Sequence, residues 1–98
     1  MIESGRDSAM LRLTLARALI QEQQFDNAAL HLESALEQDP AYTAAWKELG
    51  KLRKQMQQDE SALAAWQQGI EVAKRNGDKQ AEREMSVFVR RLLKAGQV

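Results

Sequence analysis

Apolar side chains recur at intervals of three and four residues along most of the chain, which is the pattern of amphipathic helices. Short polar or helix-breaking stretches interrupt this pattern at residues 23–25, 39–40, 57–59 and 76–78. We therefore predict an all-α fold of about five helices, at residues 8–22, 26–38, 43–56, 60–74 and 79–94. Because the turns between them are short, consecutive helices should pack as antiparallel hairpins.

Residues that stop or start helices mark two of these breaks. Pro40 cannot continue a helix and disfavours helical geometry at Asp39, while Thr43 is expected to cap the helix that follows. Gly77 can adopt the left-handed conformation that ends many helices, and Asp78 can cap the last helix.

The chain repeats itself with a period of 34 residues. When the sequence is shifted by this distance, residues of similar size meet: Leu15 and Leu49, Ala16 and Gly50, Ala28 and Ala62, Leu32 and Trp66, Ala35 and Gly69, and Leu36 and Ile70. A repeat of this length is typical of stacked helical hairpins, which bury their apolar faces against their neighbours. We predict one domain over residues 1–98, with repeats at 9–42 and 43–76 and a capping helix within 77–98.

The two units also share a residue pattern. The second carries Trp46, Leu49, Gly50, Ala62, Trp66 and Gly69, and the first carries Leu15, Ala16, Leu19, Ala28, Leu32, Ala35 and Pro40. This pattern resembles the tetratricopeptide repeat (TPR), whose unit follows Trp-x-x-Leu-Gly-x-x-Tyr, then Ala-x-x-x-Phe, Ala and Pro. The chain departs from the family at Arg12, Arg53 and Lys74, and Gln23 and Gln57 replace the turn glycine.

The resemblance covers both repeat units, and the last helix looks like the terminal helix of small bacterial TPR proteins. It implies a short right-handed solenoid of helical hairpins that serves as a non-catalytic protein–protein interaction module. Within such a hairpin, Gly50 would let the second helix approach closely. A bulky residue at Ala16, Gly50, Ala28 or Ala62 should push the helices apart, at a cost of about 1–3 kcal/mol.

The last helix is expected to close the stack, because two repeats are fewer than the roughly three that such folds need. Ala81, Met85, Phe88 and Leu92 form an apolar stripe that can cover the second hairpin. A strict 34-residue period would not turn this stripe inward. We therefore infer that the turn before the helix contains one residue more than the period requires.

Three other apolar residues of this helix, Val87, Val89 and Leu93, fall partly outside the stripe. Peripheral burial or exposure would explain them. Alternatively, they form a homodimer contact that completes the short solenoid. Charge favours association, because residues 1–40 have a net charge of −4 and residues 41–98 one of +4, although the whole chain is neutral. The sequence leaves both interpretations open.

The first helix of each hairpin lines the concave face of such a solenoid, and extended faces of this kind bind partners. The stripes expected there are Met10, Leu13, Arg17 and Ile20, then Ala44, Lys47, Lys51 and Lys54, and, after the extra residue, Lys79, Glu82, Ser86 and Val89. We predict that a partner contacts Leu13, Arg17, Lys47, Lys51, Lys54 and Lys79.

This face would be apolar at one end and basic in the middle. It suits an unknown peptide or partner helix that carries apolar anchors beside acidic side chains or a terminal carboxylate. Alternatively, the lysines merely keep a helix face solvated.

Catalytic, metal-binding and cofactor-binding residues are not predicted. The chain has no cysteine, and its single histidine, His31, lacks the convergent acid, base or metal-ligand partners that such chemistry needs. It also lacks GxSxG and GxGxxG motifs and a phosphate loop.

Nucleic acids and membranes are also disfavoured as partners. The basic residues late in the chain are interrupted by Asp78, Glu82 and Glu84, and exposed aromatic side chains for base stacking are lacking. No apolar run reaches the roughly 20 residues of a membrane span. The first residues also lack the core of a signal peptide, so we expect a cytoplasmic protein.

Overall fold

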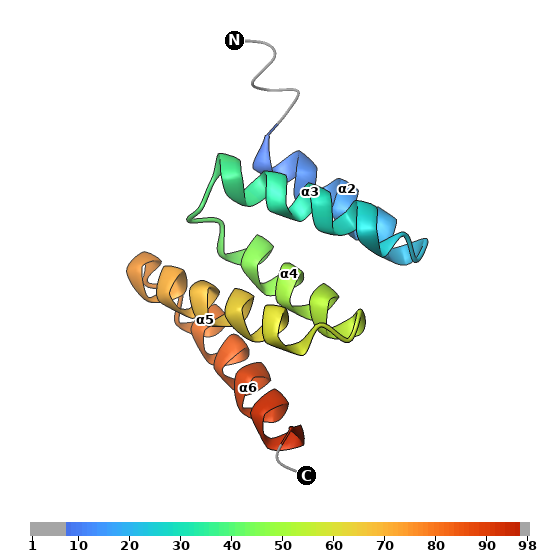
Figure 1. Ribbon diagram of the computed structural model, residues 1–98. Helices are drawn as coiled ribbons and strands as arrows, with labels where there is room; N and C mark the ends of the chain where they lie inside the picture. Colours follow the sequence, from blue (N-terminus) through green and yellow to red (C-terminus); the bar gives the residue numbers. More distant parts are fainter. Residues whose placement is uncertain (1–7, 97–98) are drawn as a thin grey trace.

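The computed structural model describes residues 8–96, and this part of the chain forms five helices and no strand. They are α2 (Ala9–Gln21), α3 (Phe25–Gln38), α4 (Thr43–Gln55), α5 (Asp59–Asn76) and α6 (Lys79–Ala95), as Figure 1 shows. Every boundary lies within two residues of the predicted one, a difference typical of helix ends. The all-α prediction is therefore confirmed. None of these five helices is long and apolar enough to cross a membrane.

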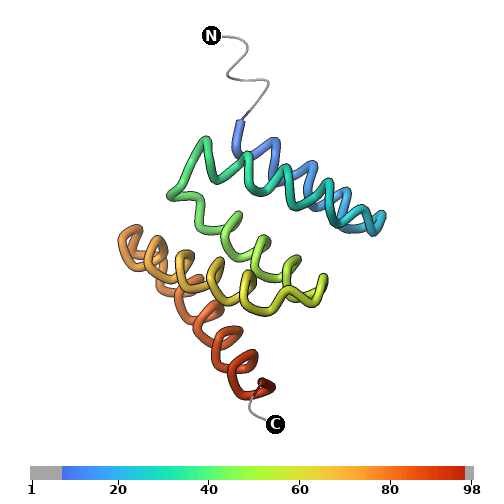
Figure 2. Tube along the Cα trace, viewed as in Figure 1, coloured from blue at the N-terminus to red at the C-terminus, as the bar shows by residue number. Residues whose placement is uncertain are grey.

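The helices stack as hairpins. Helix α2 packs against α3, α4 packs against α5, and contacts between α3 and α4 join the two hairpins. Helix α6 packs on α5 and also touches α4, so it covers the open side of the second hairpin. The first hairpin and α6 consequently lie at opposite ends of the stack (Figures 1 and 2). This is the arrangement expected of a short TPR-like solenoid.

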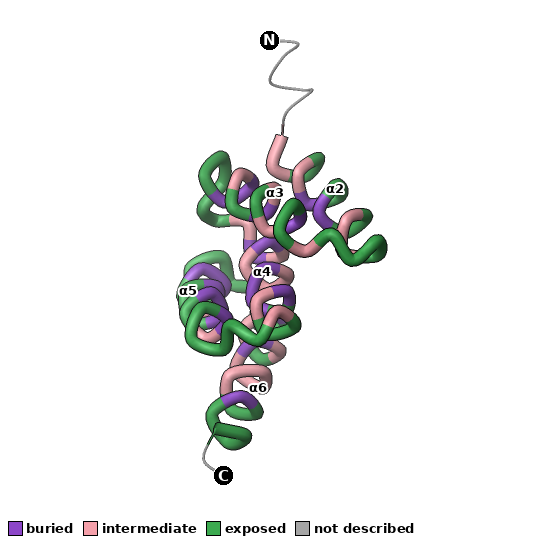
Figure 3. Tube along the Cα trace, turned by 45° about the vertical axis from the view of Figure 1, so that its right-hand side comes forward, coloured by how far each residue is buried: buried purple, intermediate pink, exposed green. Residues whose placement is uncertain are grey.

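Two apolar clusters hold the stack together. The first joins α2 and α3 to α4, and Leu32 and Leu52 are among its fully buried members. The second joins α5 to α6 around Trp66 and Met85. In Figure 3 the buried segments accordingly run through the middle of the stack, whereas the turns and the end of α6 are exposed.

The first unit is less buried than its sequence similarity to the second suggests. Leu49 is 2% exposed and lies in the cluster that contains α3, whereas the equivalent Leu15 is 41% exposed. No hairpin precedes α2 within residues 8–96, so nothing there covers α2 in the way that α3 covers α4. The end of the stack formed by α2 is therefore partly apolar.

Gly50 is needed where α4 and α5 meet. A Cβ atom at this position would overlap the indole of Trp66, which is 1% exposed. The Trp66 Nε1–H donates to the Lys47 carbonyl oxygen at 3.3 Å, so the ring edge is held against the α4 backbone. Ala16, Ala28 and Ala62 are also fully buried. The interpretation of Gly50 as a close-approach residue is confirmed.

The helix ends follow most of the predicted signals. Gly77 is left-handed, with φ of 72°, and the Ala81 N–H donates to Asp78 Oδ1 at 3.1 Å at the start of α6. The predicted cap at Thr43 is wrong, because Tyr42 occupies the cap position and Thr43 is the first helical residue. The Thr43 side chain is buried, and its hydroxyl accepts a hydrogen bond at 3.2 Å from the side-chain amide of Asn76, the last residue of α5.

Gln23 and Gln57 adopt the left-handed conformation, with φ of 61° and 62°, at the positions where the family carries glycine. This conformation costs an L-residue roughly 1–2 kcal/mol, whereas glycine adopts it freely but loses more entropy on folding. We therefore expect Gln57→Gly to raise the free energy of unfolding by about 0.5–1 kcal/mol. Urea unfolding followed by circular dichroism measures the change.

Gln57→Ala is the matched control, since it removes the polar side chain but keeps the Cβ atom that causes the strain. It should give no gain in the free energy of unfolding. An equal gain from the alanine and glycine variants would contradict the backbone explanation.

The apolar stripe of α6 lies where the sequence placed it. Ala81, Met85 and Leu92 are buried, and the Phe88 ring packs at a centroid distance of 5.2 Å from Trp66. The spacing before the helix differs from the prediction. Helix α6 begins 36 residues after α4, which is two residues more than the repeat period rather than one. Helix α5 has 18 residues against 14 in α3, and a shorter turn follows it.

Candidate partner-binding face

Two ion pairs link α2, α4 and α6, the helices expected to line the concave face. The Arg17 guanidinium of α2 lies 3.5 Å from the Glu48 carboxylate of α4. One residue earlier in α4, the Lys47 ammonium lies 2.7 Å from Glu84 of α6. Each pair joins two different helices, α2 to α4 or α4 to α6, rather than two turns of the same helix. Together they define one side of the stack, which we call the α2/α4/α6 face.

The charge of Lys47 is balanced within the fold. Its side chain is 27% exposed, and its hydrogen bond and charge hold the pKa of Glu84 below the ordinary value for a glutamate. Lys51, one turn further along α4, adds a smaller attraction to the same carboxylate. Glu84 thus stays ionised at neutral pH and offsets part of the basic stripe.

This shift predicts a pH dependence of stability. Because the folded pKa of Glu84 is lowered, its pair with Lys47 stabilises the fold fully above the ordinary glutamate pKa of about 4.3. That contribution is lost as the pH falls through the lowered value. We expect Glu84→Gln to lose less stability than the wild type between about pH 5 and pH 3 in urea unfolding at low salt. Identical acid profiles would show that the pair does not contribute to folding.

Lys51 and Lys54 remain available to a partner. Both are exposed, and within residues 8–96 neither forms an ion pair with a carboxylate. Together with Lys47 they are spaced four and three residues apart, so they share one side of α4 over about 10 Å of its length. The basic middle of the face is therefore narrower than the sequence suggests and consists mainly of these two side chains.

The structure places two of the predicted site residues away from this surface. Leu13 is 3% exposed and belongs to the first apolar cluster, so it offers almost no area to a partner. Met10, on the same side of α2, is 68% exposed and supplies the apolar surface instead. Arg17 is on the face, but its pair with Glu48 occupies it.

Lys79 is the second displaced residue. It is exposed, but it lies five residues before Glu84 and therefore about 140° around α6 from the side that meets Lys47. The stripe that contains Glu82 and Val89 is rotated off the α2/α4/α6 face in the same way.

The two glutamates that pair with the basic residues were not predicted from the sequence. Glu48 and Glu84 are each the sixth residue of their helix, 36 residues apart. This spacing matches the distance between the starts of α4 and α6 but not the repeat period. A shift of 36 residues would have aligned them, but the length of α5 that produces it could not be deduced from the repeat pattern.

Side chains suited to catalysis or metal binding are not gathered on this face. His31 Nδ1 lies 3.1 Å from the Arg12 guanidinium, in a part-buried contact between α3 and α2. No group of three or more His, Cys, Asp or Glu residues within residues 8–96 could hold a metal ion. The chemistry of the face is thus that of charged and apolar contacts.

Comparisons with known proteins agree with this architecture. A tetratricopeptide-repeat family model matches residues 9–52. A TPR repeat-containing protein of Pseudomonas aeruginosa is 44% identical over 97% of this chain and 90% of its own length. The solution structure of a Bordetella parapertussis protein is 40% identical, with a TM-score of 0.82, and covers 97% of this chain and 83% of that one. The crystal structure of a TPR domain protein from Salinibacter ruber is 25% identical, with a TM-score of 0.82 over 89% of this chain and 97% of that one.

Proposed function

Because the chain belongs to the tetratricopeptide-repeat family, we propose that it is a non-catalytic adaptor that binds a segment of a partner protein on its α2/α4/α6 face. The TPR fold is generally a protein–protein interaction module. The observation that carries the proposal is the pair of exposed lysines, Lys51 and Lys54, which lie on this face and form no ion pair with a carboxylate of residues 8–96. Arg17 and Lys47 flank them but are engaged by Glu48 and Glu84.

The charges of the face indicate the chemistry of the partner. Two free ammonium groups on one side of a helix favour acidic side chains or a terminal carboxylate. Met10, on α2, supplies an exposed apolar contact for a neighbouring anchor residue. A short acidic peptide or helix with at least one apolar side chain meets both requirements.

The test compares three baits in a pull-down from a lysate of the native source, with the bound proteins identified by mass spectrometry. The baits are the wild type, Lys51→Glu/Lys54→Glu and the control Lys74→Glu/Arg75→Glu, which makes the same charge change at exposed positions of α5. We leave Lys47 unchanged, since a glutamate there would face another carboxylate and weaken the fold. Circular dichroism checks that all baits are folded.

We expect a protein that binds the wild type and the α5 variant but not the α4 variant. With that partner purified, the α4 substitutions should weaken binding by at least about tenfold, and salt should weaken wild-type binding. If all three baits retain the same proteins, the two lysines only solvate α4 and the proposed site is wrong.

A further inference from the structure

Helix α6 lacks the partner that the other first helices have. Helices α2 and α4 are each covered by the second helix of their hairpin, α3 and α5. No second helix follows α6 within residues 8–96, so the corresponding side of α6 is open. Leu93, which is 48% exposed, lies on that side. Val89 lies about 40° from it around the helix and is partly buried against the second apolar cluster, at the border of the open side.

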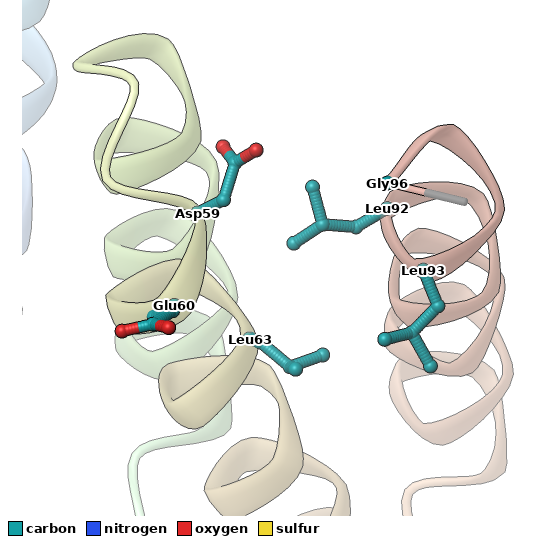
Figure 4. A pocket seen from close by; sticks show the side chains of 6 residues that line it. All are labelled: Asp59, Glu60, Leu63, Leu92, Leu93 and Gly96. Atoms are coloured by element: carbon teal, nitrogen blue, oxygen red, sulfur yellow. The ribbon is translucent and has the colours of Figure 1, made fainter. Parts of the chain in front are cut away.

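A cleft borders this open side. It has a volume of about 350 Å³ between the start of α5 and the end of α6, and its lining consists of Asp59, Glu60, Leu63, Leu92, Leu93 and Gly96. Figure 4 shows the leucine side chains extending into the gap from both helices. Asp59 and Glu60, in the first turn of α5, are exposed and line the cleft beside these leucines. The cleft is therefore apolar inside and acidic at its edge.

The chain itself carries a segment with the complementary character. Exposed Arg90, Arg91 and Lys94 lie in the last turns of α6, next to the apolar Val89 and Leu93. A second copy of α6 would thus bring both the apolar side chains that the cleft can bury and the cations that its carboxylates attract.

We propose that this surface is a homodimer interface, in which α6 of each copy lies antiparallel across α6 and the cleft of the other. Hairpin helices in this fold pack antiparallel, so the second α6 takes the place of the missing hairpin helix. A two-fold axis near Arg91 sets Val89 opposite Leu93 of the other copy. It also sets Arg90 opposite Leu92 of the other copy, at the edge formed by Asp59 and Glu60.

This inference goes beyond the proposed adaptor function and does not depend on it. The open side of α6 and the α2/α4/α6 face lie on different sides of the helix, because Val89 and Leu93 are about 140° or more around α6 from Glu84. A dimer would therefore leave both basic faces accessible and present two binding surfaces per assembly. The dimer and the partner can be tested separately.

Sedimentation equilibrium from about 1 μM to 1 mM, the range of weak interfaces, tests the dimer. We expect the mass of the wild type to rise with concentration from 11.1 kDa towards twice that value. Leu93→Lys should keep the chain monomeric, since Leu93 is exposed and its loss does not disturb the core. Leu30→Lys, at a position 62% exposed on α3, is the control and should behave as the wild type.

Charge reversals test the arrangement itself. Asp59→Arg and Arg90→Glu should each be monomeric, because both cross-copy pairs of a symmetric dimer then carry like charges. Asp59 is chosen because its carboxylate lies on the side of α5 that faces the gap (Figure 4). An equimolar mixture of the two variants should dimerise again, because one pair is then reversed and the other is wild type. Damage to the fold would not be repaired by mixing.

Three results would overturn the proposal. The wild type could remain at 11.1 kDa at every concentration. Leu93→Lys could associate as the wild type does, which would place any dimer elsewhere. The mixture of the charge variants could stay monomeric while the wild type dimerises. We expect the Lys51→Glu/Lys54→Glu variant to dimerise at the same concentrations as the wild type. Failure of the adaptor proposal would therefore not affect the dimer proposal.

Discussion

Trp66→Ala should lower the free energy of unfolding by about 3–5 kcal/mol, the range for truncating a buried tryptophan. The side chain is 1% exposed, packs on Phe88 of α6 and donates a hydrogen bond to the Lys47 carbonyl of α4. It thus joins three helices, and its removal leaves a cavity among them. Domains of this size are usually stable by only about 5–15 kcal/mol, so much of the total would be lost.

Urea unfolding followed by far-ultraviolet circular dichroism measures this loss. Trp46→Ala is the matched control, because Trp46 is only partly buried although its Nε1–H donates to the Pro40 carbonyl oxygen at 2.8 Å. Trp46→Ala should lower the free energy of unfolding clearly less than Trp66→Ala does. If it costs as much as the truncation at position 66, the second apolar cluster does not depend on Trp66 in the way that the packing indicates.

Gly50→Ala should destabilise the fold by about 1–3 kcal/mol, the usual cost of overpacking. On a free helix the same change stabilises by about 1 kcal/mol, so the sign of the effect reports on packing rather than on helix propensity. The added methyl group meets the Trp66 ring, and the ring cannot move without breaking its hydrogen bond to α4. Urea unfolding of the purified variant gives the change.

Two further variants isolate the cause. Gly96→Ala, at the end of α6, adds a methyl group whose nearest neighbour is at an ordinary 3.6 Å, and it should cost nothing. Trp66→Phe removes Nε1, the atom nearest to the added methyl group, and the hydrogen bond that holds the ring against α4, so Gly50→Ala should cost less in that background than in the wild type. Equal costs in the two backgrounds would show that another contact is responsible.

The helices and their pairing were predictable because both depend on local patterns. Apolar spacing located the helices, and the repeat equated Gly50 with Ala16 and Trp66 with Leu32, all of which are buried. Such positions are decided by contacts inside a hairpin, which recur in every unit. Leu15 shows the limit, because its burial depends on a preceding hairpin that residues 8–96 do not contain.

The composition of the α2/α4/α6 face could be predicted only in part, because it depends on how each helix is rotated about its own axis. The longer α5 and the shorter turn after it displace α6 by one residue from the expected spacing. Glu84, rather than Lys79 or another residue of the expected stripe, lies on the side of α6 that meets Lys47 of α4. Glu84 forms an ion pair with Lys47, which was expected to be free for a partner.

The two tryptophans, though both in the second repeat, belong to different apolar clusters. Trp46 packs against the cluster that includes α2 and α3, whereas Trp66 lies inside the one that joins α5 and α6. Their fluorescence is therefore a built-in pair of probes, one for each end of the solenoid. Chains with a single tryptophan, made with phenylalanine at the other position, would show whether the stack melts as a unit or loses its hairpins one after the other.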